Sequence, residues 1–124
     1  MKVLYYEKKL DKESIDARVL YRYQRFEEII KEAELLCHKN FYNASVNILY
    51  YACYYAISAL FLKDGIEAYS HKGMKTLFGL YYVKTEKIPI EQATTYFTLF
   101  EKRHSSDYDD FILILILIAR WWKN

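Results

Sequence analysis

A short stretch near the end of the chain holds residue types that often do chemistry. In "EKRHSSDYDD", Arg103 and His104 are adjacent, and Asp107 and Tyr108 follow within about one helical turn. An arginine and an aspartate four residues apart lie on one face of a helix, where the guanidinium can reach the carboxylate. Arg103 and Asp107 are therefore predicted to fix a helix end or to bind a ligand.

Catalytic and metal sites are weakly supported by spacing. Ser105, His104 and Asp107 could be written as a nucleophilic set, but triad residues normally come from separate elements. A polar turn that ends one helix and caps the next explains these three residues better. No two potential metal ligands have the spacing typical of metal sites, the candidates being His38, His71, His104, Cys37 and Asp107. We expect no catalytic residue, metal or cofactor.

Positive charge meets aromatic rings between Ser70 and Pro89. Lysines outnumber the single acidic residue, Glu86, and the group consists of His71, Lys72, Lys75, Tyr81, Tyr82, Lys84 and Lys87. Cations can hold phosphates, and tyrosine rings can stack on bases. We predict a nucleic-acid contact at Lys72 and Lys75, with a solvated helix face as the alternative.

The composition indicates that helices position these residues. With 3 Gly and 1 Pro against 14 Tyr and 7 Phe, the chain has few of the residues that tight turns require. A length of 124 residues fits one domain over 1–124. The net charge of +2 gives no long-range field that would steer a nucleic acid, a membrane or an acidic substrate. The expected fold is all-α, and a charged partner must be held locally.

Cysteine usage and the first residues favour a cytoplasmic protein. Cys37 and Cys53 are expected on adjacent antiparallel helices with an axial offset of about 15 Å, beyond the ~7 Å that a disulfide bridges. No apolar leader precedes "MKVLYYEKKLDKE". Residues 40–62 carry no charge and could span a bilayer by length, but their Asn, Ser and Tyr content favours a helix surrounded by protein. We expect no membrane contact.

Apolar spacing predicts two long helices first. Residues 11–38 read as an amphipathic helix with Asp11 or Ser14 as its cap. Residues 43–63 are apolar on both faces, which is typical of a core helix. The apolar positions that define the faces of these two helices include Tyr23, Ala44 and Tyr51.

Two further helices and an ambiguous segment follow. Gly65 is placed to end the second helix, and Ser70 is placed to cap a short helix over 71–82. Pro89 suits the first turn of a fourth helix that reaches about residue 104. The last segment, "FILILILIARWWKN", fits either a helix or a strand by periodicity. We favour a buried helix or an exposed dimer surface, since an unpaired apolar strand invites aggregation.

Several motifs occur in a fixed order along the chain. In "FYNASVNILYYACYYAISALFL" an amide precedes two tyrosines and an alanine, and later motifs place a serine before a histidine and an arginine before an aspartate and a tyrosine. The residues are Asn47, Tyr50, Tyr51, Ala52, Ser70, His71, Phe78, Tyr82, Val83, Lys84, Thr85, Leu99, Arg103, Asp107 and Tyr108. This ordered combination, over about residues 11–111, resembles the small stand-alone group of HEPN domains.

The resemblance implies a fold and a partner. HEPN domains of this group are antiparallel up-and-down helical bundles, here expected with four to five helices, and they are often homodimeric and encoded beside a minimal nucleotidyltransferase. The implied function is that of a nucleotidyltransferase partner in a two-component, toxin–antitoxin-like module. The implied ligand is a nucleotide or RNA, contacted by His71, Arg103, Asp107 and Tyr108.

The family's ribonuclease motif is absent. Toxin members are metal-independent ribonucleases in which a histidine follows the arginine after four to six residues. After Arg103 those positions hold Tyr108, Asp109 and Asp110, and tyrosine does not titrate near neutral pH as histidine does. A ribonuclease that pairs Arg103 with His71, and a purely structural dimerisation module, are the two alternative functions.

Overall fold

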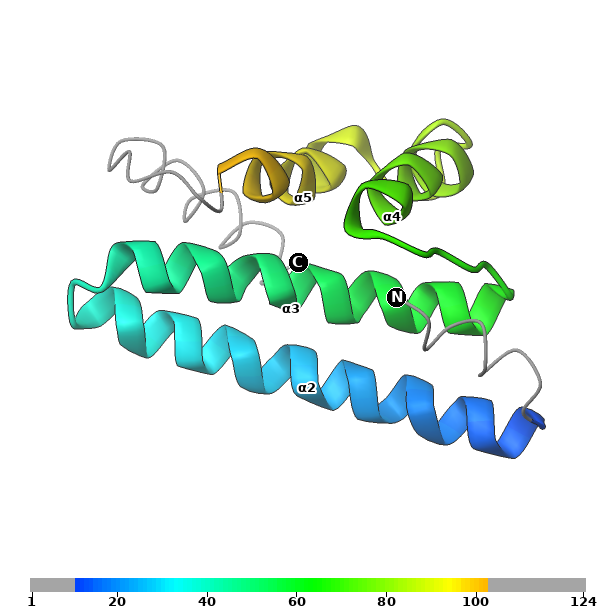
Figure 1. The fold of residues 1–124 in the computed structure, drawn as a ribbon, viewed down its shortest axis with the longest axis horizontal. Helices are drawn as coiled ribbons and strands as arrows, with labels where there is room; N and C mark the ends of the chain where they lie inside the picture. Colours follow the sequence, from blue (N-terminus) through cyan, green and yellow to red (C-terminus); the bar gives the residue numbers. More distant parts are fainter. Residues whose placement is uncertain (1–10, 103–124) are drawn as a thin grey trace.

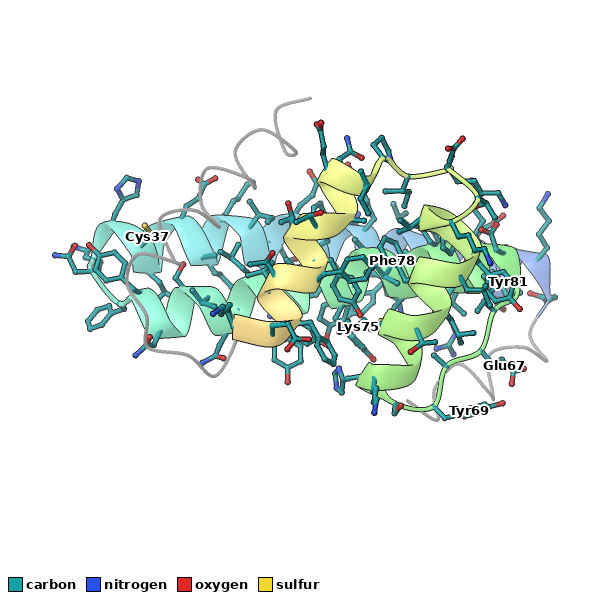
Figure 2. All side chains as sticks on the ribbon, turned by 90° about the horizontal axis from the view of Figure 1, so that it is seen from above. Cys37, Glu67, Tyr69, Lys75, Phe78 and Tyr81 are labelled. Atoms are coloured by element: carbon teal, nitrogen blue, oxygen red, sulfur yellow. The ribbon has the colours of Figure 1, made fainter. Side chains whose placement is uncertain are left out.

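The computed structural model describes residues 11–102, and within that range every regular element is helical. α2 (Lys12–His38) and α3 (Tyr42–Asp64) form a long antiparallel hairpin (Figure 1). α4 (His71–Phe78) and α5 (Ile90–Lys102) lie on the other side of α3 and cross it at a steep angle (Figure 2). The predicted all-α helical bundle is confirmed, with α3 as its middle element.

Local capping chemistry sets the ends of α2. The Asp11 carboxylate accepts a hydrogen bond of 2.8 Å from the backbone N–H of Ser14, which makes Asp11 the N-cap. At the other end Asn40 has a φ of 66°, and the N–H of Phe41 donates to the carbonyl of Leu36 at 2.9 Å. Asn tolerates this left-handed conformation better than most residues, so it can end a helix as glycine does.

Small side chains let the first half of α3 approach α2 closely. The hydroxyl of Ser45 donates to the backbone carbonyl of Ala33 at 2.9 Å, and both residues are almost fully buried. Larger apolar residues fill the space along the rest of this interface, among them Phe26, Ile29, Ile30, Val46 and Leu49. The two helices therefore form one layer with a continuous apolar seam.

Both sides of α3 contribute to the core, as its composition predicts. By length and composition α3 could also cross a membrane, but more than half of its most apolar stretch is buried inside the protein. Three of the predicted apolar positions are nevertheless exposed: Tyr23 and Tyr51, at 51% and 48%, and Ala44. Cys37 and Cys53 are free thiols, in agreement with the expected offset.

The chain turns from α3 into α4 through the two residues singled out in the sequence. Gly65 has a φ of 71°, and the N–H of Ile66 donates to the carbonyl of Phe61 at 2.9 Å. This is the glycine-ended arrangement that closes many helices. The Ser70 hydroxyl then accepts from the N–H of Gly73 at 2.9 Å, so α4 begins at His71.

The predicted helix over 71–82 changes its winding after Phe78. η1 (Gly79–Val83) is a π-helical turn, in which the N–H of Lys84 donates to the carbonyl of Gly79 at 2.8 Å. Such wide turns are uncommon and are often found beside functional surfaces. α5 then starts directly after Pro89, whose missing N–H costs nothing at a helix start.

Tyr82 fastens η1 to the end of α3. Its hydroxyl donates to the Asp64 carboxylate at 2.5 Å, and its ring stacks on Phe61 and Phe78 with centroid distances of 5.9 and 5.7 Å. Burial, and then the neighbouring Asp64 carboxylate, raise the pKa of the Tyr82 hydroxyl. Tyr82 is thus a core residue, and its ring is not free to stack on a base.

Two glycine substitutions are expected to have opposite effects on stability. Gly65→Ala should lower the free energy of unfolding by about 1 kcal/mol, because alanine is strained at the left-handed φ of this residue. Gly79→Ala should raise it by about 0.5 kcal/mol, because Gly79 is right-handed and a Cβ there meets only an ordinary contact with Phe97 at 3.9 Å. Urea unfolding measures the change in the free energy of unfolding for each variant. A change in the same direction for both variants would contradict the backbone conformations assigned to the two glycines.

Tyr82 should make the protein sensitive to alkaline pH. An unfolded tyrosine ionises near pH 10, whereas the folded pKa is raised. The protonated hydroxyl therefore contributes its full stability below about pH 10, and that contribution is lost as the pH rises above about 10. Tyr82→Phe should show a smaller fall in unfolding free energy between about pH 9 and 11 than the wild type. Tyr81→Phe, at an exposed neighbour, should follow the wild type.

Candidate functional site

His71 lies where α4 meets the middle of α3. Its Nδ1 atom and the Oη atom of Tyr50 are 2.7 Å apart and share a hydrogen bond, in which the imidazole tautomer decides the donor. Tyr50 is fully buried, while His71 is partly exposed. The bond therefore joins the core to the surface at the first residue of α4.

Three tyrosines of α3 surround the His71 ring. The ring centroids of Tyr50, Tyr51 and Tyr54 lie 5.7, 6.3 and 5.4 Å from that of His71. Tyr51 is exposed, and Asn47 is exposed one turn before it on the same face. We call the surface formed by Asn47, Tyr51, Tyr54 and His71 the His71 face. It presents flat rings, an imidazole and an amide to solvent.

α5 brings two aromatic residues of its second half, Tyr96 and Phe100, to the same place. Tyr96 stacks on Tyr50 with a centroid distance of 6.2 Å, and Phe100 meets the edge of Tyr50 at 6.0 Å. Phe78 of α4 joins them through an edge contact of 5.3 Å with Tyr96. One aromatic cluster therefore holds α3, α4 and α5 together directly beneath the His71 face.

The structure places one of the four predicted ligand-binding residues. His71 lies on the His71 face, whereas Arg103, Asp107 and Tyr108 lie outside the described residues. In the sequence Arg103 follows Lys102, the last residue of α5, three positions after the Phe100 that contacts Tyr50.

The two predicted nucleic-acid contacts differ in their surroundings. Lys72 is exposed beside His71. The Lys75 ammonium donates to the Glu101 carboxylate at 2.9 Å and lies 4.8 Å from the centre of the Phe100 ring. The hydrogen bond and charge of Lys75 lower the pKa of Glu101. Lys75 therefore links α4 to α5, and Lys72 is the freer cation for a ligand.

The three tyrosines around His71 were not among the predicted ligand-binding residues, although Tyr50 and Tyr51 belong to the ordered motif set. Their signal was present in "YYACYY", because tyrosines one turn apart on a helix share a face. In residues 11–102 no group of three His, Cys, Asp or Glu side chains gathers closely enough to hold a metal ion. The His71 face can stack flat rings and exchange a proton through its imidazole, both without a metal.

Removing the Tyr50 hydroxyl should destabilise the protein. Tyr50→Phe is expected to lower the free energy of unfolding by about 1 kcal/mol, because the hydrogen bond to His71 is lost while the ring still fills the core. Tyr51→Phe, on an exposed neighbour, should change it by less than about 0.3 kcal/mol. Chemical denaturation compares the two variants, and equal losses would contradict the role given to the Tyr50–His71 bond.

The sequence matches a known domain family and several known proteins. The family model of the HEPN domain matches residues 19–114. A UPF0332 protein of Thermotoga maritima is 34% identical over 92 residues, which are 74% of this chain and 70% of that protein. A protein of Methanocaldococcus jannaschii named "Putative toxin" is 27% identical over 86 residues, or 69% of this chain and 58% of its own length.

A UPF0332 protein of Gloeobacter violaceus is 31% identical over 67 residues, which cover 54% of this chain and 53% of that protein. The matched regions thus span little more than half the length of the Methanocaldococcus and Gloeobacter proteins. No solved structure gives a significant match to the chain. The family model covers most of the chain, including all the described helices from Val19 onward, and the chain therefore belongs to the HEPN domain family.

Proposed function

We propose that this HEPN domain binds RNA or a nucleotide at the His71 face. The observation that carries the proposal is the arrangement of Tyr51, Tyr54 and His71 around the buried Tyr50 hydroxyl, with the exposed Lys72 beside them. Aromatic faces stack on bases without strict sequence preference, and a lysine attracts a phosphate. The low net charge of +2 means that such local contacts must supply the affinity.

The biological setting of this binding is a two-component, toxin–antitoxin-like module with a minimal nucleotidyltransferase. One support is the name of the Methanocaldococcus relative, which is "Putative toxin". The other is the ordered motif set that includes Ser70, His71 and Arg103. The expected residues for the nucleotide or RNA are His71, Arg103, Asp107 and Tyr108, together with Lys72 and Lys75.

A homodimer in the cytoplasm belongs to the same proposal. α2 exposes several large apolar side chains on its outer surface, with 51% to 61% of each accessible: Leu20, Tyr21, Tyr23 and Leu35. Burying such side chains against a second copy would be favourable. The apolar run in 111–119 is a further contribution expected from the sequence.

A ribonuclease is the second candidate function, and one contact favours it. Phe100 contacts Tyr50, so the end of α5 lies at the His71 face. Arg103 follows Phe100 by three positions in the sequence. A histidine from α4 could then act with an arginine from another element, as catalytic groups often do. Incubation of the purified chain with tRNA and mRNA tests this candidate. Cleavage that Arg103→Ala and His71→Ala each abolish would replace the binding proposal by this one.

Binding at the His71 face is tested with a pair of variants that each remove one exposed aromatic ring. We expect Tyr51→Leu to weaken binding of a labelled single-stranded RNA of about 12 nucleotides roughly tenfold, because one stacked base is lost. Phe41→Leu removes an exposed ring at the turn between α2 and α3 and should leave the affinity unchanged. Fluorescence anisotropy measures both. Equal losses in the two variants, or no binding by the wild type, would contradict the assignment of this surface.

The salt dependence of RNA binding tests the role of Lys72 independently of the tyrosine variant. If its ammonium neutralises one phosphate, Lys72→Gln should reduce the slope of log affinity against log salt by about 0.7. Lys31→Gln, on the exposed side of α2, is the charge-matched control and should keep the wild-type slope.

The partner proposal is tested by co-expression and pull-down with a minimal nucleotidyltransferase encoded beside this chain. Failure to form a complex would remove it.

A further inference from the structure

The outer side of α4 and η1 carries a continuous exposed ridge. Lys72, Thr76, Leu80 and Lys84 follow one another at intervals of four residues, and all four are exposed. Residues four apart on a helix lie one above the other on a single face. The buried side chains of the same segment point the other way, into the core. We call the four exposed residues the α4 ridge, which begins beside His71 and ends directly after η1.

Each end of the α4 ridge combines a cation with an exposed aromatic ring. Lys72 lies beside the His71 face, whose rings belong to Tyr51 and Tyr54. At the other end Tyr81 is 45% exposed and stands three residues before Lys84, a spacing that makes neighbours on a helix surface. Tyr81 lies on the side of α4 away from α5 (Figure 2). Each end can therefore stack one base and hold one phosphate.

Backbone and side-chain hydrogen bonds fix the second of these ends. The N–H of Lys84 donates to the carbonyl of Gly79 at 2.8 Å, and the hydroxyl of Thr85 donates to the carbonyl of Tyr81 at 2.7 Å. Residues 84–87 include two lysines and one glutamate, so the net charge of this turn is positive. The backbone that carries the ring and the cation is thus ordered before a ligand arrives, which reduces the entropy lost on binding.

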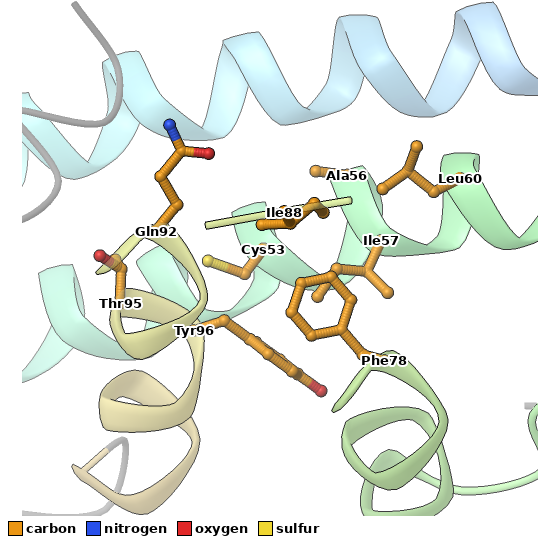
Figure 3. Close-up of a pocket in the computed structure, with 9 residues that line it drawn as sticks. All are labelled: Cys53, Ala56, Ile57, Leu60, Phe78, Ile88, Gln92, Thr95 and Tyr96. Atoms are coloured by element: carbon orange, nitrogen blue, oxygen red, sulfur yellow. The ribbon is translucent and has the colours of Figure 1, made fainter. Parts of the chain in front are cut away.

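The pocket between α3 and α5 offers no alternative path for a phosphate chain. It is partly open to solvent and is lined mainly by apolar side chains, among them Ile57, Phe78 and Tyr96 (Figure 3). None of the described residues that line it is charged. A phosphate placed there would lose its hydration without gaining a cation. Lys75, which joins α4 to α5, is already paired with Glu101. The α4 ridge is therefore the better path.

The length of the α4 ridge sets the size of its ligand. Lys72 and Lys84 are twelve residues apart, which corresponds to about 18 Å along a helix axis. Phosphates of a stacked strand follow one another at about 3.4 Å, so roughly five steps cover this distance. A mononucleotide carries phosphate at one end only, and can therefore occupy only one end of the ridge.

We infer that the ligand of this domain is a single-stranded RNA of at least about six nucleotides that runs along the α4 ridge. The strand starts at the His71 face and reaches a second contact, where one base stacks on Tyr81 and one phosphate pairs with Lys84. This inference rests on the proposed function, because its first contact is the His71 face. It adds the class of ligand and two residues that recognise it.

Two lengths of RNA test the second contact. A labelled strand of about 12 nucleotides can span the α4 ridge, whereas the dinucleotide UpU has a single phosphate and cannot. We expect Tyr81→Leu to weaken binding of the long strand about tenfold in fluorescence anisotropy. The same variant should leave the affinity for UpU, followed by NMR through the His71 ring signals, unchanged. An unchanged affinity for the long strand, or an equal loss for both ligands, would overturn the inference.

Two control variants separate stacking from other effects of the substitution. Tyr81→Phe keeps the ring and should bind the long strand as the wild type does. Phe41→Leu removes an exposed ring at the turn between α2 and α3 and should also leave the affinity unchanged. Loss of affinity in Tyr81→Phe equal to that in Tyr81→Leu would contradict stacking on this ring.

The salt dependence of binding tests Lys84. Lys84→Gln should reduce the slope of log affinity against log salt by about 0.7 for the long strand, and the double variant Lys72→Gln, Lys84→Gln should reduce it by about 1.4. Lys39→Gln, exposed at the turn between α2 and α3, should keep the wild-type slope. A wild-type slope in Lys84→Gln would overturn the second contact and leave binding at the His71 face intact. Absence of binding by the wild type would contradict the proposed function itself.

Discussion

The packing of α4 and α5 on α3 depends on the hydrogen bond between the buried Tyr50 hydroxyl and His71. α3 is covered by α2 on one side and by α4 and α5 on the other, so a tyrosine hydroxyl in its middle cannot reach water. An unpaired buried hydroxyl would cost about 1–3 kcal/mol. Ser70 caps α4 so that its first residue, His71, forms a hydrogen bond with this hydroxyl. The ring of Tyr50 also packs against Tyr96 and Phe100 of α5.

Local chemistry made the helix boundaries predictable. Asp11, Gly65 and Ser70 each act on neighbouring backbone groups, so their roles follow from residue type and position. Exposure along α3 could not be predicted in the same way. The helix is apolar around its whole circumference, and only the tertiary arrangement leaves Tyr51 open to solvent. The change to π-helical winding at Gly79 likewise has no signal in the spacing of apolar residues.

The candidate site was only partly accessible from the sequence. His71 was found because the order of motifs resembles HEPN domains, and no rule of spacing would have joined it to Tyr50, twenty-one residues earlier. The pairing of Lys75 with Glu101 spans twenty-six residues and depends on α4 and α5 lying side by side across α3. The pocket beside Tyr96 arises from packing between elements, which a sequence pattern does not encode. Arg103, Asp107 and Tyr108 remain predictions from sequence.

The central claim is that ligand binding takes place at the imidazole held by Tyr50. His38 ends α2 at the turn of the hairpin, whereas His71 lies against the middle of α3, so His38 is an internal reference within the same molecule. Titration of histidine-labelled protein with single-stranded RNA, followed through the ring signals of His38 and His71, tests the claim most directly. The account predicts a saturable shift of the His71 signals while those of His38 stay in place. Equal shifts of both, or saturable binding that leaves His71 unmoved, would contradict it.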